Sequence, residues 1–276
     1  MDYKRILTIQ DISCVGQCSL TVALPILSAC GLETAILPSA VLSTHTMGFE
    51  GFTVRDLSED IPKIAKHWDK EGIKFDGIYT GYLGSTEQID YVMDIFEKLL
   101  ASGGKKIVDP AMADFGKLYP AFDAEYVEAM KKLVSVSDLT IPNITEAAFL
   151  VGQEYKEVYD EAYINTLVDG LIKLGAKEVV LTGVSYDDAT TGIVVSDGIE
   201  SKYYRHEKLP LSCHGTGDVY ASAFVGAYMH GKSSYEASGI AGEYTVKCIK
   251  NTVGDESHWY GVKFEPVLID LINALN

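Results

Sequence analysis

The sequence lacks the features that would direct it to a nucleic acid or a membrane. It has no run of lysine or arginine, and 39 acidic against 23 basic residues give a formal net charge of -16. This charge would repel a polyanionic backbone or an anionic lipid surface. No apolar stretch approaches the length of a membrane span, and the N-terminal residues show no signal-peptide pattern. We therefore expect a cytosolic protein that binds neither nucleic acid nor membranes.

Cysteine is scarce and is not spaced for metal binding. The five cysteines are an odd number, and no two of them form a C-x-x-C pair. Cys14 and Cys18 are four residues apart, but no second pair of cysteines or histidines accompanies them. We expect reduced thiols, with these two engaged in packing.

Hydrophobic residues, in contrast, are abundant at 47% of the 276 residues, so the chain can bury a large core. No internal repeat, low-complexity tract or linker divides it. A length of this order is compatible with one large α/β domain, and we predict a single domain over residues 1–276.

Short apolar runs alternate with longer segments of helical periodicity. The runs read as buried strands at 5–9, 34–37, 77–80, 106–108, 139–141 and 179–182. One helix is expected after Ser85, with Ser85 and Gln88 as a capping box and Gly103 at its end, and another before Gly175. The alternation predicts an α/β fold with a mostly parallel sheet and helices on both faces. Ligands in such sheets bind beyond the carboxyl ends of the strands, where this sequence places many polar residues.

Two glycine-rich stretches compete as phosphate-binding loops. Residues 226–233 satisfy the P-loop pattern G-x-x-x-x-G-K-[ST], which must lie between a strand and a helix. Residues 219–229, however, are apolar almost all round and read as a buried helix, with Gly226 inside it and Gly231 at its end. Lys232 and the serines after it then begin the next helix. The P-loop match is therefore interpreted as false.

The second stretch, Gly215-Thr216-Gly217-Asp218, lies just before the same helix. Free backbone N–H groups and the positive end of the helix dipole attract anions at this position. An isolated aspartate here would be an N-cap, but a cap does not explain the two glycines. This stretch is the predicted phosphate loop.

Five further motifs occur at the strand ends, in order along the chain. They are Ile9-Gln10 with a loop that contains Gly16, S-T-H-T at 43–46, T-G-Y-L-G-S at 80–85, D-P-A-M-A-D at 109–114 and P-N-I-T-E at 142–146. Together with G-T-G-D at 215–218, they resemble the motifs of pyridoxal kinases of the ribokinase superfamily. The resemblance implies a ribokinase-like three-layer fold and a homodimer. It also implies transfer of the ATP γ-phosphoryl group to the 5'-hydroxymethyl of pyridoxal, pyridoxine or pyridoxamine, with Mg2+ and a monovalent cation such as K+ as candidate cofactors.

The same resemblance assigns roles to residues of this chain. The implied catalytic residues are Gly215, Thr216, Gly217 and Asp218. The amides of the first three would bind the transferring phosphoryl group, and Asp218 would accept the hydroxyl proton. The metal group is Asp109 and Glu146, and the ATP-binding group is Asp114, Asn143, Thr182, Gly183 and Thr216. The substrate-binding group is Asp11, Ser13, His45, Thr46 and Tyr82, of which His45 is expected to be structural rather than catalytic.

Other functions remain open at this point. Asp11 stands where pyridoxal kinases usually carry a serine, and Asp11-Ile12-Ser13 resembles the D-P-S of hydroxymethylpyrimidine kinases. A thiamine-pathway kinase is therefore the second interpretation, and a ribokinase-fold binding protein without catalysis is a third. A cysteine hydrolase with Cys213 and His214 is disfavoured, because adjacent residues of an extended segment point to opposite sides. Residues 113–120, which show little helical or strand period, are predicted to be a mobile lid.

Overall fold

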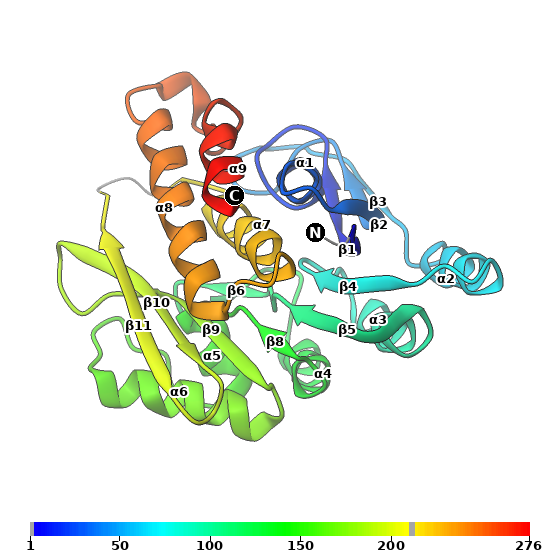
Figure 1. Ribbon diagram of the computed structural model, residues 1–276, viewed down its shortest axis with the longest axis horizontal. Helices are drawn as coiled ribbons and strands as arrows, with labels where there is room; N and C mark the ends of the chain where they lie inside the picture. Colours follow the sequence, from blue (N-terminus) through cyan, green and yellow to red (C-terminus); the bar gives the residue numbers. More distant parts are fainter. Residues whose placement is uncertain (1–2, 210–212) are drawn as a thin grey trace.

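The computed structural model describes residues 3–209 and 213–276 and centres on a nine-stranded sheet (Figure 1). In spatial order the strands are β11 (Ser201–Glu207), β10 (Thr190–Ser196), β9 (Glu178–Val184), β8 (Leu139–Thr140), β5 (Leu100–Val108), β4 (Phe75–Thr80), β1 (Arg5–Ser13), β2 (Glu33–Leu42) and β3 (Val54–Asp56). The pairs from β9 to β2 are parallel, and antiparallel pairs add β10 and β11 at one edge and β3 at the other. Each of the six predicted strands falls within one of these parallel strands, except that β8 ends one residue before Ile141.

Helices cover both faces of the sheet. One face carries α1 (Leu20–Ala29), α7 (Thr216–Met229), α8 (Ser234–Thr252) and α9 (Leu268–Leu275), with the 3-10 segments η1 (Glu256–His258) and η2 (Glu265–Val267) between the last two. The opposite face carries α2 (Ile61–Lys70), α3 (Thr86–Leu99), α4 (Ala124–Ser135), α5 (Ile144–Val151) and α6 (Glu161–Leu174). This arrangement confirms the predicted three-layer α/β fold. Among the described helices, none combines the length and apolar character needed to cross a bilayer.

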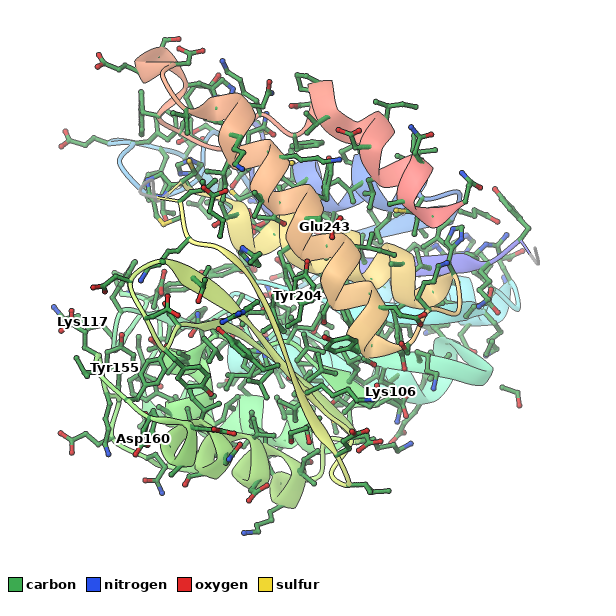
Figure 2. The ribbon with its side chains drawn as sticks, turned by 60° about the vertical axis from the view of Figure 1, so that its left-hand side comes forward. Lys106, Lys117, Tyr155, Asp160, Tyr204 and Glu243 are labelled. Atoms are coloured by element: carbon green, nitrogen blue, oxygen red, sulfur yellow. The ribbon has the colours of Figure 1, made fainter. Side chains whose placement is uncertain are left out.

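Successive strand residues supply the two cores. In β1, Ile6 packs into the core beneath α1 and α7, whereas Leu7 and Ile9 pack into the core on the opposite face. The alternation follows from the two-residue period of a strand, and burial on both faces explains why the central strands read as continuous apolar runs. At the edge, the Tyr204 ring of β11 lies against Gly239 and Gly242 of α8, so the absence of side chains there allows a close approach (Figure 2).

Two helix-end predictions differ from the structure. The Ser85 side chain caps α3 by accepting from the Gln88 N–H at 3.3 Å, but the Gln88 side chain does not return to Ser85. It is fully buried: its Oε1 atom accepts from the Gly84 N–H at 2.8 Å, and its Nε2 atom donates to the Ser39 carbonyl and the Ser58 hydroxyl. The predicted capping box is therefore half formed, because the oxygen that would accept from the Ser85 N–H is bound to Gly84 instead. Gly103 does not end the helix either, since α3 stops at Leu99, whereas Gly175 does end α6 as predicted.

Residues 113–118 are also more regular than predicted. They form a hairpin of β6 (Ala113–Asp114) and β7 (Lys117–Leu118), whose turn residues Phe115 and Gly116 have φ of 49° and 76°. The Gly116 N–H donates to the Thr145 hydroxyl at 3.1 Å, which fixes the turn to α5. Figure 2 shows Lys117 beside Tyr155, whose ring packs against Gly116. Closure of this hairpin over a ligand remains a prediction.

The structure resolves the choice between the two glycine-rich stretches. Gly226 lies inside α7, where a Cβ atom would approach the Cys30 Sγ to 2.4 Å. Gly231 follows the end of α7 with φ of 90°, and Ser233 caps α8 in a capping box with Glu236. Residues 226–233 therefore form a helix end, as predicted, and not a phosphate loop. The cysteines are free thiols; Cys18 is buried as expected, but Cys14 is exposed.

We predict that Gly226→Ala lowers the free energy of unfolding by about 1–3 kcal/mol, because the added methyl group overpacks the contact with Cys30. The affinity of the folded variant for ATP should not change. Urea denaturation and nucleotide titration measure the two quantities. Adding Cys30→Ala removes the Sγ atom and should restore part of the lost stability. Loss of ATP binding without loss of stability would instead support a P-loop.

Candidate active site at the carboxyl edge of the sheet

Four carboxylates converge at the carboxyl edge of the parallel strands. Asp11 lies near the end of β1 and Asp109 directly after β5, while Glu146 and Asp218 lie in the first turns of α5 and α7. Burial raises the pKa of Asp109 and of Asp218, and repulsion adds to these shifts, from Glu146 and Asp218 at Asp109 and from Asp11 at Asp218. None of the ion pairs formed within residues 3–209 and 213–276 includes any of the four. The site therefore holds unpaired negative charge.

The predicted phosphate loop lies directly before α7 and needs glycine at its first position. Gly215 has φ of 77°, and a Cβ atom there would lie 1.6 Å from the Gln17 carbonyl oxygen. Gly217, in contrast, faces open space, because a Cβ atom added there would have no neighbour within 4 Å. Because the first N–H groups of a helix have no partner within the helix, those after Gly215 are available to an anion. The open side of Gly217 gives that anion room.

Asp218 carries the pKa shift with the clearest chemical use. Burial raises its pKa from 3.8 to about 7, and repulsion from Asp11 adds to this shift. A hydrogen bond from the Ser19 backbone opposes it. A carboxylate with a pKa near neutrality is basic enough to accept a proton from a hydroxyl group during a reaction.

Glu146 is a buried carboxylate whose two oxygens are held by the backbone. It is 3% exposed and accepts from the N–H groups of Met112 at 3.1 Å and Asn143 at 2.8 Å. Burial nevertheless raises its pKa, and burial also raises the pKa of the neighbouring Asp109 well above the ordinary value.

The two carboxylates would fit Mg2+ if phosphate and water supplied the other ligands, which is how this ion binds in phosphoryl-transfer sites. A cluster of three or more protein ligands is not found among the described residues, so an all-protein metal cage is not part of the site.

The predicted ATP-binding residues lie together beside this pair. Asn143 caps α5 through its Oδ1 atom and donates from Nδ2 to the Ala113 carbonyl at 2.9 Å, so it joins α5 to the hairpin that carries Asp114. Asn143 also forms a β-bridge with Thr182. Gly183 follows Thr182 with φ of 74° and open space at its Cβ position. The backbone here could therefore approach a ligand closely.

The predicted substrate residues lie in β1 and in the segments after β2 and β4, which are its two neighbours in the sheet. Asp11 is 5% exposed and accepts from the Ser13 hydroxyl at 3.0 Å; both residues belong to β1 rather than to the loop after it. Tyr82 is half-buried, and burial and the Asp11 charge raise the pKa of its hydroxyl. Thr46 is exposed. Asp11 lies on β1, between β4, which precedes Tyr82, and β2, which precedes His45.

Both ring nitrogens of His45 are occupied. Its Nδ1 accepts from the Met47 N–H at 3.2 Å, so Nε2 carries the proton that is donated to the Tyr260 carbonyl at 2.7 Å. This arrangement supports a structural role and argues against proton transfer by His45. The sequence analysis missed Tyr260, because this contact joins residues 215 positions apart and no local pattern announces it.

Cys213 and His214 do not resemble a hydrolase pair. Burial raises the pKa of the Cys213 thiol, which opposes the thiolate that a nucleophile needs. The His214 ring lies 5.5 Å from that of His45, and burial lowers the pKa of His214. The hydrolase interpretation is therefore unsupported.

Comparison with known proteins identifies the family of this chain. Residues 27–262 match the family model described as phosphomethylpyrimidine kinase. The chain belongs to the phosphomethylpyrimidine kinase family. Among its relatives in this kinase family, the chain is 26% identical over 243 residues to the pyridoxal kinase PdxY of Actinobacillus pleuropneumoniae, a match that covers 85% of the chain and 84% of the relative.

Two solved structures resemble this kinase over nearly its full length. A provisionally assigned phosphomethylpyrimidine kinase from Bacteroides thetaiotaomicron, crystallised with pyridoxal, is 34% identical with a TM-score of 0.92, over 98% of this chain and 96% of that one. The pyridoxal kinase of Lactobacillus plantarum is 30% identical with a TM-score of 0.91, over 99% and 98%.

The two glycines of the loop provide a matched pair of variants. We predict that Gly215→Ala lowers the free energy of unfolding by roughly 3 kcal/mol or more, because the methyl group meets a backbone oxygen at a positive φ. Gly217→Ala should leave it unchanged or raise it by up to about 1 kcal/mol, since alanine favours the helix and has room there. Chemical denaturation measures both. Equal effects would show that Gly215 is not the anchored position.

Proposed function

We propose that this kinase transfers the γ-phosphoryl group of ATP to the 5'-hydroxymethyl of a B6 vitamer: pyridoxal, pyridoxine or pyridoxamine. The observation that carries the proposal is the placement of Asp218, with a pKa of about 7, in the first turn of a helix whose glycine loop is open to an anion. The relatives support a B6 vitamer as substrate, since two are pyridoxal kinases and a third was crystallised with pyridoxal.

The amides at the start of α7 bind the transferring phosphoryl group. Phosphoryl transfer passes through a loose transition state. The main requirement on the protein is therefore to stabilise the charge on the phosphoryl oxygens. Fixed N–H groups at Thr216 and Gly217 provide this stabilisation without reorganising during the reaction. The Gly215 turn holds them in place against Gln17.

Asp218 accepts the proton of the vitamer hydroxyl as its oxygen bonds to phosphorus. Its raised pKa makes it a stronger base than an ordinary aspartate, and it is ionised above about pH 7. Asp11, whose own pKa burial raises, contributes to this basicity through its charge. Protonation of Asp218 relieves the repulsion between the two carboxylates.

Asp109 and Glu146 would hold Mg2+, with Glu146 acting through water because backbone N–H groups occupy both of its oxygens. When bound there, the ion would supply neutralisation of the phosphate charge. Asn143, Thr182, Gly183 and Asp114 line the nucleotide side, whereas Ser13, His45, Thr46 and Tyr82 line the vitamer side.

Several parts of the proposal rest on the family resemblance. We infer that residues 1–276 act as one kinase domain, that the protein is a cytosolic homodimer, and that a monovalent cation such as K+ assists the nucleotide. The single sheet that joins the first and last thirds of the chain supports one domain.

A hydroxymethylpyrimidine is the second candidate substrate. The family description and the Asp11-Ile12-Ser13 segment favour it. A binding protein without catalysis is disfavoured, because Asp109, Glu146 and Asp218 are all retained at the site.

We predict that Asp218→Asn lowers kcat roughly 10²- to 10⁴-fold, because the amide keeps the shape of the side chain but cannot accept a proton. Nucleotide affinity should remain close to that of the wild type. Product formation from the three B6 vitamers and hydroxymethylpyrimidine, together with nucleotide titration, measures both. A near wild-type kcat would remove Asp218 from the mechanism, and turnover of the pyrimidine alone would favour the second substrate.

A further inference from the structure

A continuous aromatic strip extends from the glycine loop to the surface. His214 directly precedes Gly215, and its ring lies 5.5 Å from the His45 ring. The His45 ring lies 5.0 Å from Phe49, edge to face, and Phe49 lies 4.7 Å from Trp259. We refer to these four side chains, His214, His45, Phe49 and Trp259, as the aromatic strip. Trp259 is its outer end and is 49% exposed.

The strip contacts the loop after β1, the strand that carries Asp11. The His45 backbone N–H donates to the Val15 carbonyl at 3.2 Å, and a Cβ atom at Gly16 would lie 2.3 Å from the His45 ring. Tyr82, after β4, belongs to a separate aromatic group, with its ring 5.4 Å from that of Phe122. The two aromatic groups therefore follow β2 and β4, the two strands that flank β1 in the sheet. A planar heteroaromatic ring, which has two faces to bury, suits a site of this kind.

A distant segment, residues 258–261 between α8 and α9, braces the strip. The Tyr260 carbonyl fixes the His45 ring at 2.7 Å, and the Trp259 ring lies over Gly48, where a Cβ atom would approach it to 2.7 Å. At Gly261 a Cβ atom would lie 2.4 Å from the Gln17 Cβ. The segment therefore contacts both loops that surround the vitamer side, the one after β1 and the one after β2.

The contacts within the segment make it a rigid brace. The His258 Nδ1 atom lies 2.8 Å from the Gly261 carbonyl, and the His258 and Tyr260 rings are 4.4 Å apart. The Trp259 and Tyr260 rings meet at 87°, edge to face. Since aromatic contacts of this geometry stabilise beyond the area they bury, the segment is held in one arrangement.

We infer that Trp259 is a positioning residue for the vitamer ring: it backs Phe49, and through Phe49 and His45 it sets the width of the aromatic slot beside Asp11. The inference rests on the proposed function, because it concerns the substrate end of that same site. Trp259 acts on binding of the heteroaromatic ring and not on the phosphoryl transfer. Its contacts Phe49 and His45 follow β2, whereas Asn143 and Thr182 lie at β8 and β9, on the other side of β1 in the sheet.

The test is steady-state kinetics of Trp259→Ala with pyridoxal and ATP. Removal of the ring leaves Phe49 and Gly48 uncovered, and we expect the KM for pyridoxal to rise roughly tenfold, the effect of about one aromatic contact. The KM for ATP and kcat should change little. Trp259→Phe retains a ring against Phe49 and should restore most of the affinity for pyridoxal.

Tyr235→Ala is the matched control. Tyr235 is also a partly exposed aromatic residue, 39% exposed, but it packs against Tyr204 on the outer edge of the sheet. We expect its kinetic constants to equal those of the wild type. Unchanged KM for pyridoxal in Trp259→Ala would overturn the inference, and so would equal rises in the two KM values or failure of Trp259→Phe to rescue.

A second measurement does not depend on the alanine variant. The chain has two tryptophans, and the other one, Trp68 of α2, packs against Phe75. In the Trp68→Phe variant, tryptophan fluorescence therefore reports Trp259 alone. Saturation with pyridoxine in the absence of nucleotide should change this fluorescence. No change would overturn the inference. If the wild type phosphorylates no B6 vitamer, the proposed function fails instead.

Discussion

The structure depends on one electrostatic constraint: four carboxylates share the carboxyl edge of a parallel sheet without a basic partner among the described residues. Burial raises the pKa of Asp11, Asp109, Glu146 and Asp218, and repulsion from neighbouring carboxylates adds to the shift at Asp109 and Asp218. The charge destabilises the folded protein as pH rises through these values, because the folded state then binds more protons than the unfolded state. A bound cation would relieve this cost, which is why the same crowding suits a metal-dependent phosphoryl transfer.

The fold meets this constraint with backbone donors rather than side-chain cations. Glu146 is held by two N–H groups, and the amides after Gly215 remain free for the substrate's own negative charge. The backbone is left-handed where it achieves this: Gly215 adopts φ of 77° without strain, whereas Ser19, whose backbone hydrogen bonds to Asp218, is strained at φ of 54°. Strain of this kind persists only where the surrounding packing enforces it.

The sequence allowed most of the architecture and the carboxylates to be predicted, because both depend on short-range patterns. Apolar runs revealed the central strands, and in open α/β sheets the residues after them meet at one edge. The features that could not be predicted depend on tertiary contacts. The Gln88 amide donates to partners 30 and 49 residues away while its oxygen accepts from Gly84 instead of Ser85, and the Tyr260 carbonyl contacts His45 across 215 residues. No periodicity or capping rule encodes such contacts, so the contact that fixes His45 could not be anticipated.

The most direct test of the electrostatic account is an infrared titration of carboxyl groups in the wild type and in Asp218→Asn. The account predicts a protonated-carboxyl band in the wild type that disappears as pH rises through about 7 and that the variant lacks. Mg2+ with a nucleotide should shift this titration to lower pH, because the cation favours the ionised form. If the band that distinguishes the two proteins titrates near the ordinary value of 3.8, the account is contradicted.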